Sequence, residues 1–173
     1  MTVPPVVSVV GYSNVGKTTL LEKLIAELKR RGYRVATIKH DRHGFDIDRP
    51  GKDTWRHAQA GSDLVVIAAP DRVAMIARTP EELSLDEILA RLPVDVDIVL
   101  TEGYKQGDKP KIEVSRAACG QRLLTPENEL LGLATDQRFP GVEVPQYGLD
   151  DAAGLADLLE RRVLGASSHS HIP

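Results

Sequence analysis

The chain has 173 residues and a net charge of −3, and hydrophobic residues make up 42% of it. This length and apolar content allow one α/β domain with a real core, and they are unlike the composition of disordered proteins. The charge lacks the Lys and Arg excess of nucleic-acid-binding domains, so we expect no nucleic-acid partner. We also expect no membrane association, because no apolar stretch is long enough to span a bilayer and no signal segment opens the chain. The single cysteine, Cys119, excludes an internal disulfide and fits a reducing cytoplasm.

The first expected elements are a strand, a glycine-rich loop and a helix. Val6–Val10 is a β-branched run typical of a buried strand, and leucines recur at helical spacing from Leu20 to Leu28. The loop between them fits the phosphate-binding pattern of a glycine, four residues and Gly-Lys-Thr. A glycine turn without a ligand is the alternative interpretation. This order predicts a nucleotide phosphate site at Gly11, Ser13, Asn14, Val15, Gly16, Lys17, Thr18 and Thr19.

Three residues of this loop have expected roles. Lys17 should reach the β- and γ-phosphates as a catalytic contact, and Thr18 should ligate Mg²⁺. Asn14 lies where many such loops have glycine, and asparagine tolerates the positive φ that the loop requires.

The next segment is basic. Arg34–Ile38 is predicted as a strand, and residues 29–57 hold nine Lys or Arg against four Asp. This favours a further anion site beside the loop, with a solvated mixed-charge surface as the alternative. Lys39 and His40 are candidate phosphate contacts. Asp41 ends the strand segment and is a candidate for binding Mg²⁺ or polarising the attacking water.

Several further elements follow in chain order. Asp53 is expected to cap a short helix ending at Gly61, and Leu64–Ala68 and Val73–Ala77 are predicted to form a strand pair. Ser84-Leu85-Asp86-Glu87 is a capping box that begins an amphipathic helix. Strands are expected at Val96–Thr101, Ile112–Val114 and Leu130–Ala134, and Asp150 or Asp151 should cap a last helix.

Two acidic residues follow apolar strands. Glu102 comes directly after Val96–Thr101, where a P-loop protein that binds Mg·nucleotide needs a carboxylate, so we expect it on the Mg²⁺ side or positioning water. Asp136 follows Leu130–Ala134 and either accepts the N1–H and 2-amino hydrogen bonds of guanine or caps a turn.

Strands alternating with helices predict an α/β P-loop NTPase with a mainly parallel sheet, helices on both faces and some antiparallel strands. Residues 1–165 would form a single nucleotide-binding domain, and 166–173 a disordered tail whose His169 and His171 are candidate metal ligands. Ligands bind beyond the carboxyl ends of such strands, so the P-loop and the loops after Ile38, Thr101 and Ala134 should meet at one edge.

Four segments resemble the MobB family of molybdopterin-guanine dinucleotide biosynthesis proteins. They are Gly11–Thr19, Ile38-Lys39-His40 running through Asp46–Asp53, Ala60-Gly61, and Glu102-Gly103-Tyr104-Lys105. The resemblance implies a GTP-binding, weakly hydrolysing homodimer with Mg²⁺, which assists the MobA nucleotidyltransferase in attaching GMP to molybdopterin. By position, Lys17, Thr18 and Glu102 would form the nucleotide–Mg²⁺ set. His40, Asp46, Asp48, Arg49 and Lys52 would be site residues without assigned roles.

The chain contains no Asn-Lys-x-Asp motif for reading guanine, so the expected GTP preference comes from the resemblance alone. Lys105, Lys109 and Lys111 would suit the phosphate of molybdopterin, a candidate ligand, or an acidic partner surface. Two other functions remain open on the residues. One is a small-molecule kinase or ATP-dependent ligase that binds its substrate through Lys39, Arg42 and Arg49, and the other is a metal-delivery GTPase that uses the histidines.

Overall fold

The computed structural model describes residues 3–93, 95–120 and 122–165. The predicted tail at 166–173, with His169 and His171, lies outside the described residues. Two compact units make up the chain: the first contains Met1–His40 and Pro93–Pro173, and the second contains Asp41–Leu92. The second unit is thus inserted in the sequence of the first, and the single domain over residues 1–165 stays a prediction.

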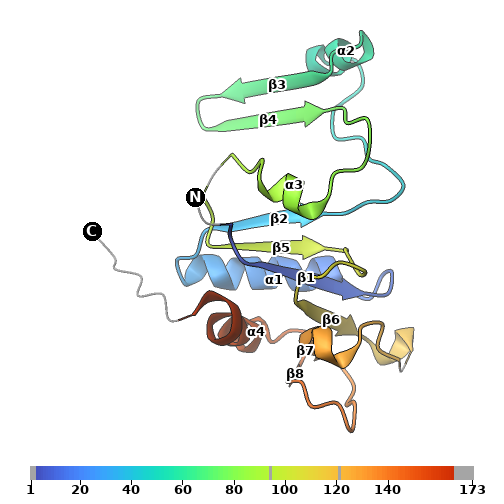
Figure 1. Cartoon of the computed structure of the whole chain (residues 1–173), viewed down its shortest axis with the longest axis vertical. Coiled ribbons are helices and arrows are strands. Elements are labelled where there is room, and N and C mark those ends of the chain that lie inside the picture. The colour runs from blue at the N-terminus through green and yellow to red at the C-terminus, as the bar shows by residue number, and fades with distance from the viewer. Residues whose placement is uncertain (1–2, 94, 121, 166–173) are drawn as a thin grey trace. The chain divides into compact units, whose positions relative to one another are not determined.

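The first unit is built on a six-stranded parallel sheet with the order β2-β5-β1-β6-β7-β8 (Figure 1). The strands are β1 (Val6–Gly11), β2 (Val35–Lys39), β5 (Ile98–Glu102), β6 (Lys111–Ser115), β7 (Leu130–Thr135) and β8 (Gln146–Tyr147). The central strand β1 is buried along its whole length, as its β-branched sequence predicts. The predicted α/β class with a mainly parallel sheet is confirmed. Because the strands are parallel, the loops that follow their carboxyl ends all lie at the same edge of the sheet.

Two helices, α1 (Lys17–Arg30) and α4 (Ala152–Leu159), pack on this sheet and against each other. Their apolar side chains recur at helical spacing and form one core with alternate strand residues such as Val7 and Val9. The helix residues at its centre are Leu20, Leu24, Leu28, Leu155, Leu158 and Leu159, each at most 2% exposed. This core fixes the start of α1, and therefore the phosphate loop, against the sheet. A π-helical turn at Glu160–Leu164 continues α4.

The second unit contains the antiparallel hairpin of β3 (Leu64–Ala69) and β4 (Arg72–Ala77), as the sequence predicts, with α2 (Asp53–Gln59) and α3 (Leu85–Leu89). The predicted capping box is present, because the Ser84 and Glu87 side chains each accept from the other's backbone N–H. One boundary differs from the prediction. Lys52 is the N-cap of α2, and Asp53 is its first helical residue, where a carboxylate still suits the helix dipole.

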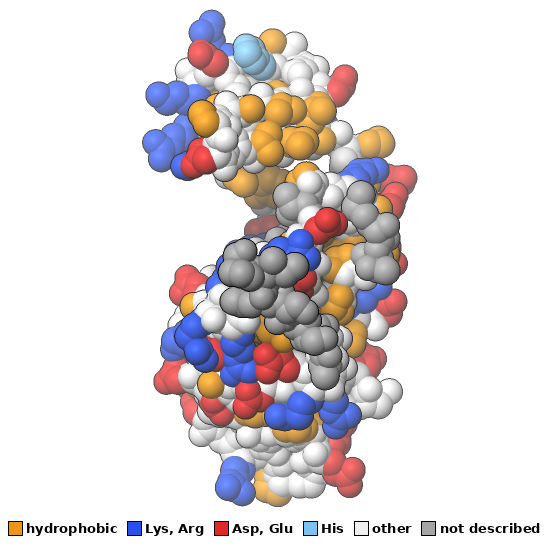
Figure 2. All heavy atoms as spheres, turned by 90° about the vertical axis from the view of Figure 1, so that its left-hand side faces the viewer, with side chains coloured by type: hydrophobic (Ala, Val, Ile, Leu, Met, Phe, Trp, Pro, Cys, Tyr) orange, Lys and Arg blue, Asp and Glu red, His pale blue; other side chains and the backbone are white. Residues whose placement is uncertain are grey.

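Apolar side chains are exposed on the hairpin. Figure 2 shows them gathered on the surface of the second unit. The most exposed are Leu64, Val66, Ile67, Val73 and Met75, at 49–57% of their full area. Among the described residues, no helix combines the length and apolar character that a membrane crossing requires.

Candidate nucleotide-binding site

The loop between β1 and α1 has the backbone of a phosphate cradle. Gly11, Asn14 and Gly16 all have positive φ, at 151°, 59° and 105°. The prediction that Asn14 tolerates this conformation is therefore confirmed. Gly11 is required by space as well, since a Cβ there would lie 2.6 Å from the Val114 carbonyl oxygen. The loop thus packs closely against β6. Its backbone N–H groups, together with those of the first turn of α1, are the kind that bind a phosphate.

Lys17 begins α1 and folds back over this loop. Its Nζ donates to the carbonyl oxygens of Tyr12, at 2.8 Å, and Gly11, at 3.4 Å. Burial lowers the pKa of Lys17, and the positive charges of Lys105 and Lys39 act in the same direction, against the opposing charge of Glu102. Three lysines therefore share one end of the sheet, and an anion bound there would relieve their mutual repulsion.

Thr18 and Glu102 meet at the same end. The Thr18 Oγ1 donates to the carboxylate of Glu102, with both oxygens at 3.0 Å. The contact exists because β5 runs parallel to β1, with Glu102 beside Val9, so that the end of β5 reaches the start of α1. Mg²⁺ prefers hard oxygen ligands and commonly binds one or two carboxylates together with phosphates. This hydroxyl–carboxylate pair fits a Mg²⁺ ion that accompanies a phosphate on the loop.

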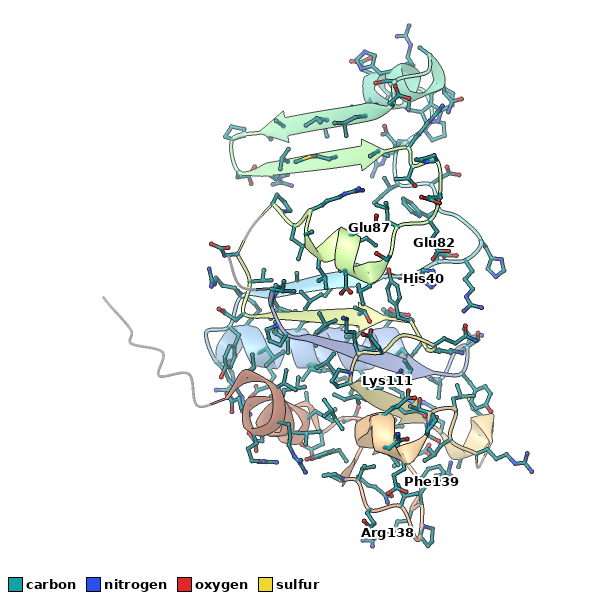
Figure 3. All side chains as sticks on the ribbon, viewed as in Figure 1. His40, Glu82, Glu87, Lys111, Arg138 and Phe139 are labelled. Atoms are coloured by element: carbon teal, nitrogen blue, oxygen red, sulfur yellow. The ribbon has the colours of Figure 1, made fainter. Side chains whose placement is uncertain are left out.

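Beyond Glu102 the chain turns through two successive residues with positive φ, Gly103 at 104° and Tyr104 at 54°. A non-glycine residue in this region is uncommon, and such conformations concentrate at functional sites. The turn stacks the Tyr104 ring on His40, with ring centroids 4.7 Å apart. His40 lies at the end of β2, as labelled in Figure 3, and its N–H donates to the Glu102 carbonyl oxygen. The stack joins the ends of β2 and β5 beside the phosphate loop.

Arg116 is a site residue that the sequence reasoning missed. It directly follows β6, and its Nε donates to the Val15 carbonyl oxygen at 2.8 Å. Its guanidinium also lies 3.4 Å from where a Cβ on Gly16 would be. The available signal was a cation two residues beyond the predicted strand Ile112–Val114, because this strand is the second neighbour of β1 in the sheet.

Asp136 follows β7, two strands from the phosphate loop. One of its carboxylate oxygens, Oδ1, accepts from the Ala117 N–H at 2.8 Å. This bond ties Asp136 to the start of the turn Ala117–Cys119, 19 residues away in the sequence, and it does not cap the turn that contains Asp136 itself. Both roles considered for Asp136 stay predictions. The residue also lines a cavity at the ends of β7 and β8.

The other predicted site residues belong to the second unit and are described within it. Asp41 Oδ1 accepts from the His43 N–H, so this carboxylate holds its own loop. Asp48 Oδ1 accepts from the Arg49 N–H, while its buried Oδ2 has no hydrogen-bond partner among the described residues. Asp46 and Asp48 line a cavity of about 170 Å³ in this unit, and Lys52 closes a turn onto the Arg49 carbonyl. Their part in ligand binding stays a prediction.

Lys111 is not available to bind a phosphate, and that prediction is wrong. The side chain is 1% exposed, its Nζ donates to the Gly107 carbonyl oxygen at 2.7 Å, and it forms an ion pair with Glu129. A buried ammonium needs such partners, so Lys111 holds the loop before β6 in place. The sequence shows Lys105, Lys109 and Lys111 as alike, whereas the register of β6 turns Lys111 inward.

Comparison with known proteins gives a consistent assignment. The family model described as molybdopterin guanine dinucleotide synthesis protein B, MobB, matches residues 6–136. A Haemophilus influenzae protein named molybdopterin-guanine dinucleotide biosynthesis adapter protein is 42% identical over 133 residues, covering 76% of this chain and 75% of its own. The Escherichia coli protein of the same name is 35% identical over 163 residues, with 91% and 93% covered.

Solved structures agree with this assignment. A crystal structure of molybdopterin-guanine biosynthesis protein B has a TM-score of 0.69 at 30% identity and covers 89% of this chain and 97% of that one. A crystal structure of Bacillus subtilis MobB also gives 0.69, at 25% identity, with 90% and 95% covered. The matched region includes the phosphate loop, Glu102 and Asp136. The chain therefore belongs to the MobB family of molybdopterin-guanine dinucleotide synthesis proteins.

Proposed function

We propose that this protein is a GTP-binding adapter in the conversion of molybdopterin to its guanine dinucleotide form. The observation that carries the proposal is the Thr18–Glu102 contact beside the phosphate loop, with Lys17 on the same loop. Membership of the MobB family supplies the biosynthetic context, since relatives at 35% and 42% identity carry the adapter name. The phosphate end of the site is the part that the geometry supports best.

Mg²⁺ would be held by the Thr18 hydroxyl and the Glu102 carboxylate. The hydrogen bond that now joins them brings both oxygens to one point, and a cation there would bind both in its place. When bound, the ion neutralises charge on the β- and γ-phosphates. Lys17 would bind the same phosphates, and Glu102 would orient the attacking water.

Hydrolysis is expected to be slow, which suits an adapter better than a metabolic enzyme. P-loop GTPases without an arginine on the γ-phosphate turn over slowly until a partner supplies one. The proposed partner is a MobA-type nucleotidyltransferase. It would respond to the conformation that the bound nucleotide gives to the loops at residues 39–52 and 103–111. Phosphorylation of a small molecule at roughly tens of turnovers per second would instead support the kinase alternative.

The second unit would provide the contact surfaces for a homodimer, and its polar loop a site for molybdopterin. The exposed apolar hairpin supports the homodimer, because large apolar surfaces of this kind mark protein interfaces. Arg49 and Lys52 supply positive charge for the phosphate of molybdopterin, and the partnerless oxygen of Asp48 is an acceptor for a ring N–H.

The first test is the loss of nucleotide binding in Lys17→Ala. Calorimetry with GTP and Mg²⁺ should show affinity at least about 100-fold weaker, since charge-assisted hydrogen bonds to two phosphates are lost. Lys29→Ala is the matched control, because Lys29 is an exposed lysine at the other end of the same helix. Equal affinity of the Lys17→Ala variant and the control would refute the phosphate assignment.

A further inference from the structure

A cavity of about 640 Å³ lies at the carboxyl ends of β7 and β8, in the same unit as the phosphate loop. β6 lies between β1 and β7, so the ends of β1 and β7 are about 10 Å apart, or two strand spacings. The ribose and α-phosphate of a nucleotide can bridge such a distance. The cavity is therefore placed where the base would lie if the phosphates occupied the loop at Gly11–Thr18.

Asp136 is the acidic residue in the lining of this cavity. Its Oδ1 accepts one hydrogen bond, from the Ala117 N–H, and none of the described residues donates to its Oδ2. An ionised carboxylate only accepts, and its two oxygens have about four acceptor positions. Asp136 can consequently accept further hydrogen bonds from a ligand that presents two adjacent N–H donors.

The position of Asp136 relative to the phosphate loop is fixed by hydrogen bonds. Arg116 Nε donates to the Val15 carbonyl oxygen at 2.8 Å, and the next residue, Ala117, donates its N–H to Asp136. The two residues after β6, Arg116 and Ala117, therefore connect the phosphate loop to the carboxylate of Asp136. Such support keeps a recognition group in position before the ligand arrives.

The cavity walls are also braced. The Gln146 side-chain amide accepts from the Phe139 N–H and donates to the Phe139 carbonyl oxygen, both at 3.0 Å. The Gln137 amide donates to Gly120 O at 3.0 Å and to Ser115 Oγ at 3.3 Å. Phe139 and Tyr147 contribute aromatic surface to the lining, and Figure 3 places Phe139 and Arg138 on the loop after β7. A planar ring thus has both an apolar surface and an acceptor.

We propose that this cavity is the base subsite and that Asp136 selects guanine through its N1–H and 2-amino group. The proposal rests on the proposed function, because it requires the phosphates to occupy the loop at Gly11–Thr18. Guanine presents two adjacent donors to a carboxylate, whereas adenine has an acceptor at N1 and no 2-amino group. Asp136 and the Arg116 tether would together replace the Asn-Lys-x-Asp motif that the chain lacks.

The test compares GTP, ATP, inosine triphosphate and xanthosine triphosphate on the full chain with Mg²⁺, by calorimetry. The wild type should bind inosine triphosphate about ten-fold or more weakly than GTP, because it lacks the 2-amino donor, and ATP weaker still. Asp136→Asn should lose GTP affinity by a similar factor and gain affinity for xanthosine triphosphate. An asparagine amide donates to the xanthine C2 carbonyl and still accepts from the Ala117 N–H.

Asp157→Asn is the matched control, since Asp157 lies on α4 and bonds Arg31, outside the cavity. It should keep the wild-type order of the four nucleotides. An unchanged preference for GTP over xanthosine triphosphate in Asp136→Asn would overturn the base assignment, and so would equal affinity of the wild type for GTP and ATP. In both cases, loss of binding in Lys17→Ala would still uphold the phosphate site. Absence of binding to all four nucleotides would contradict both proposals.

Discussion

Glu102 accepts a hydrogen bond from Thr18 and pairs in register with Lys39 across β2 and β5. Glu102 is therefore the strand neighbour of Lys39, a candidate phosphate contact, while its carboxylate contacts Thr18. We expect Glu102→Gln to lower GTP hydrolysis by about 100-fold, since the amide holds Mg²⁺ and the attacking water poorly. Binding of GTP should weaken much less, because the contacts from the phosphate loop remain.

Single-turnover hydrolysis and calorimetry on the same preparation separate these two effects. The control is Asp97→Asn, which removes a carboxylate at the opposite end of β5 that bonds Arg34. Unchanged turnover in Glu102→Gln would refute the water-positioning role of Glu102.

The sequence predicts some of these residues and not others for a physical reason. Gly11, Lys17 and Thr18 form a contiguous motif whose function depends on local backbone conformation, so spacing alone identifies them. Arg116 and Asp136 act through the parallel pairing of β6 and β7, in which Ser115 lies beside Thr135. The spacing of residues along the chain does not reveal that Arg116 and Asp136 follow paired strands. From the sequence, Asp136 is a candidate either to bind guanine or to cap a turn, and no pattern assigns a role to Arg116.

At the level of elements, Arg31 joins α1 to α4. Its Nη1 donates to Asp157 and Glu160, each at 2.7 Å, and its Nε donates to Glu27 at 2.8 Å. The hydrogen bonds from Arg30 and Arg31 hold the pKa of Glu27 at about 2, below its ordinary value of 4.5. Because the folded-state pKa is depressed, this contribution to stability is present above 4.5 and is lost as the pH falls through about 2.

Glu27→Gln should therefore unfold at lower urea concentration than the wild type at neutral pH. The difference in the free energy of unfolding should shrink as the solution is acidified, since the wild-type carboxylate becomes protonated. Glu22→Gln, at an exposed position of the same helix, is the control. A difference that stays constant across this pH range would show that the effect of Glu27 comes from packing and not from its charge.

The elements themselves were predicted where the local pattern is strong. The strands of the sheet core and α1 have apolar runs or helical periodicity, and their positions agree with the sequence to within a few residues. The strand β8 was missed, because Gln146–Tyr147 is two residues long and has no apolar run. It exists as a strand through its pairing with Leu133 and Ala134 of β7. Tertiary pairing of this kind is invisible to a pattern read along the chain.

At the level of the whole molecule, the hairpin is the surface that most requires a partner. Val66 pairs with Met75 and Ala68 with Val73, so Leu64, Val66, Val73 and Met75 share one exposed face. Residues of the opposite face, such as Val65 and Ile76, line an apolar cavity of about 380 Å³ with Phe45 and Ile47, and Met75 and Ala77 also contribute to its lining. A two-stranded sheet is marginal in water by itself, and its unpaired edges invite another strand. A second copy of the chain would cover both the apolar face and the edges.

Replacing Val66 and Met75 together by lysine should therefore convert the proposed homodimer to a monomer in sedimentation equilibrium, because two facing charges would be buried on association. Val3→Lys is the control, since Val3 is an apolar residue of the first unit that is 74% exposed. The doubly substituted chain should still bind GTP, because Lys17, Thr18 and Glu102 all belong to the first unit. A dimer that survives both lysines would exclude this hairpin face as the interface. Loss of GTP binding in a folded monomer would instead mean that nucleotide binding depends on the dimer.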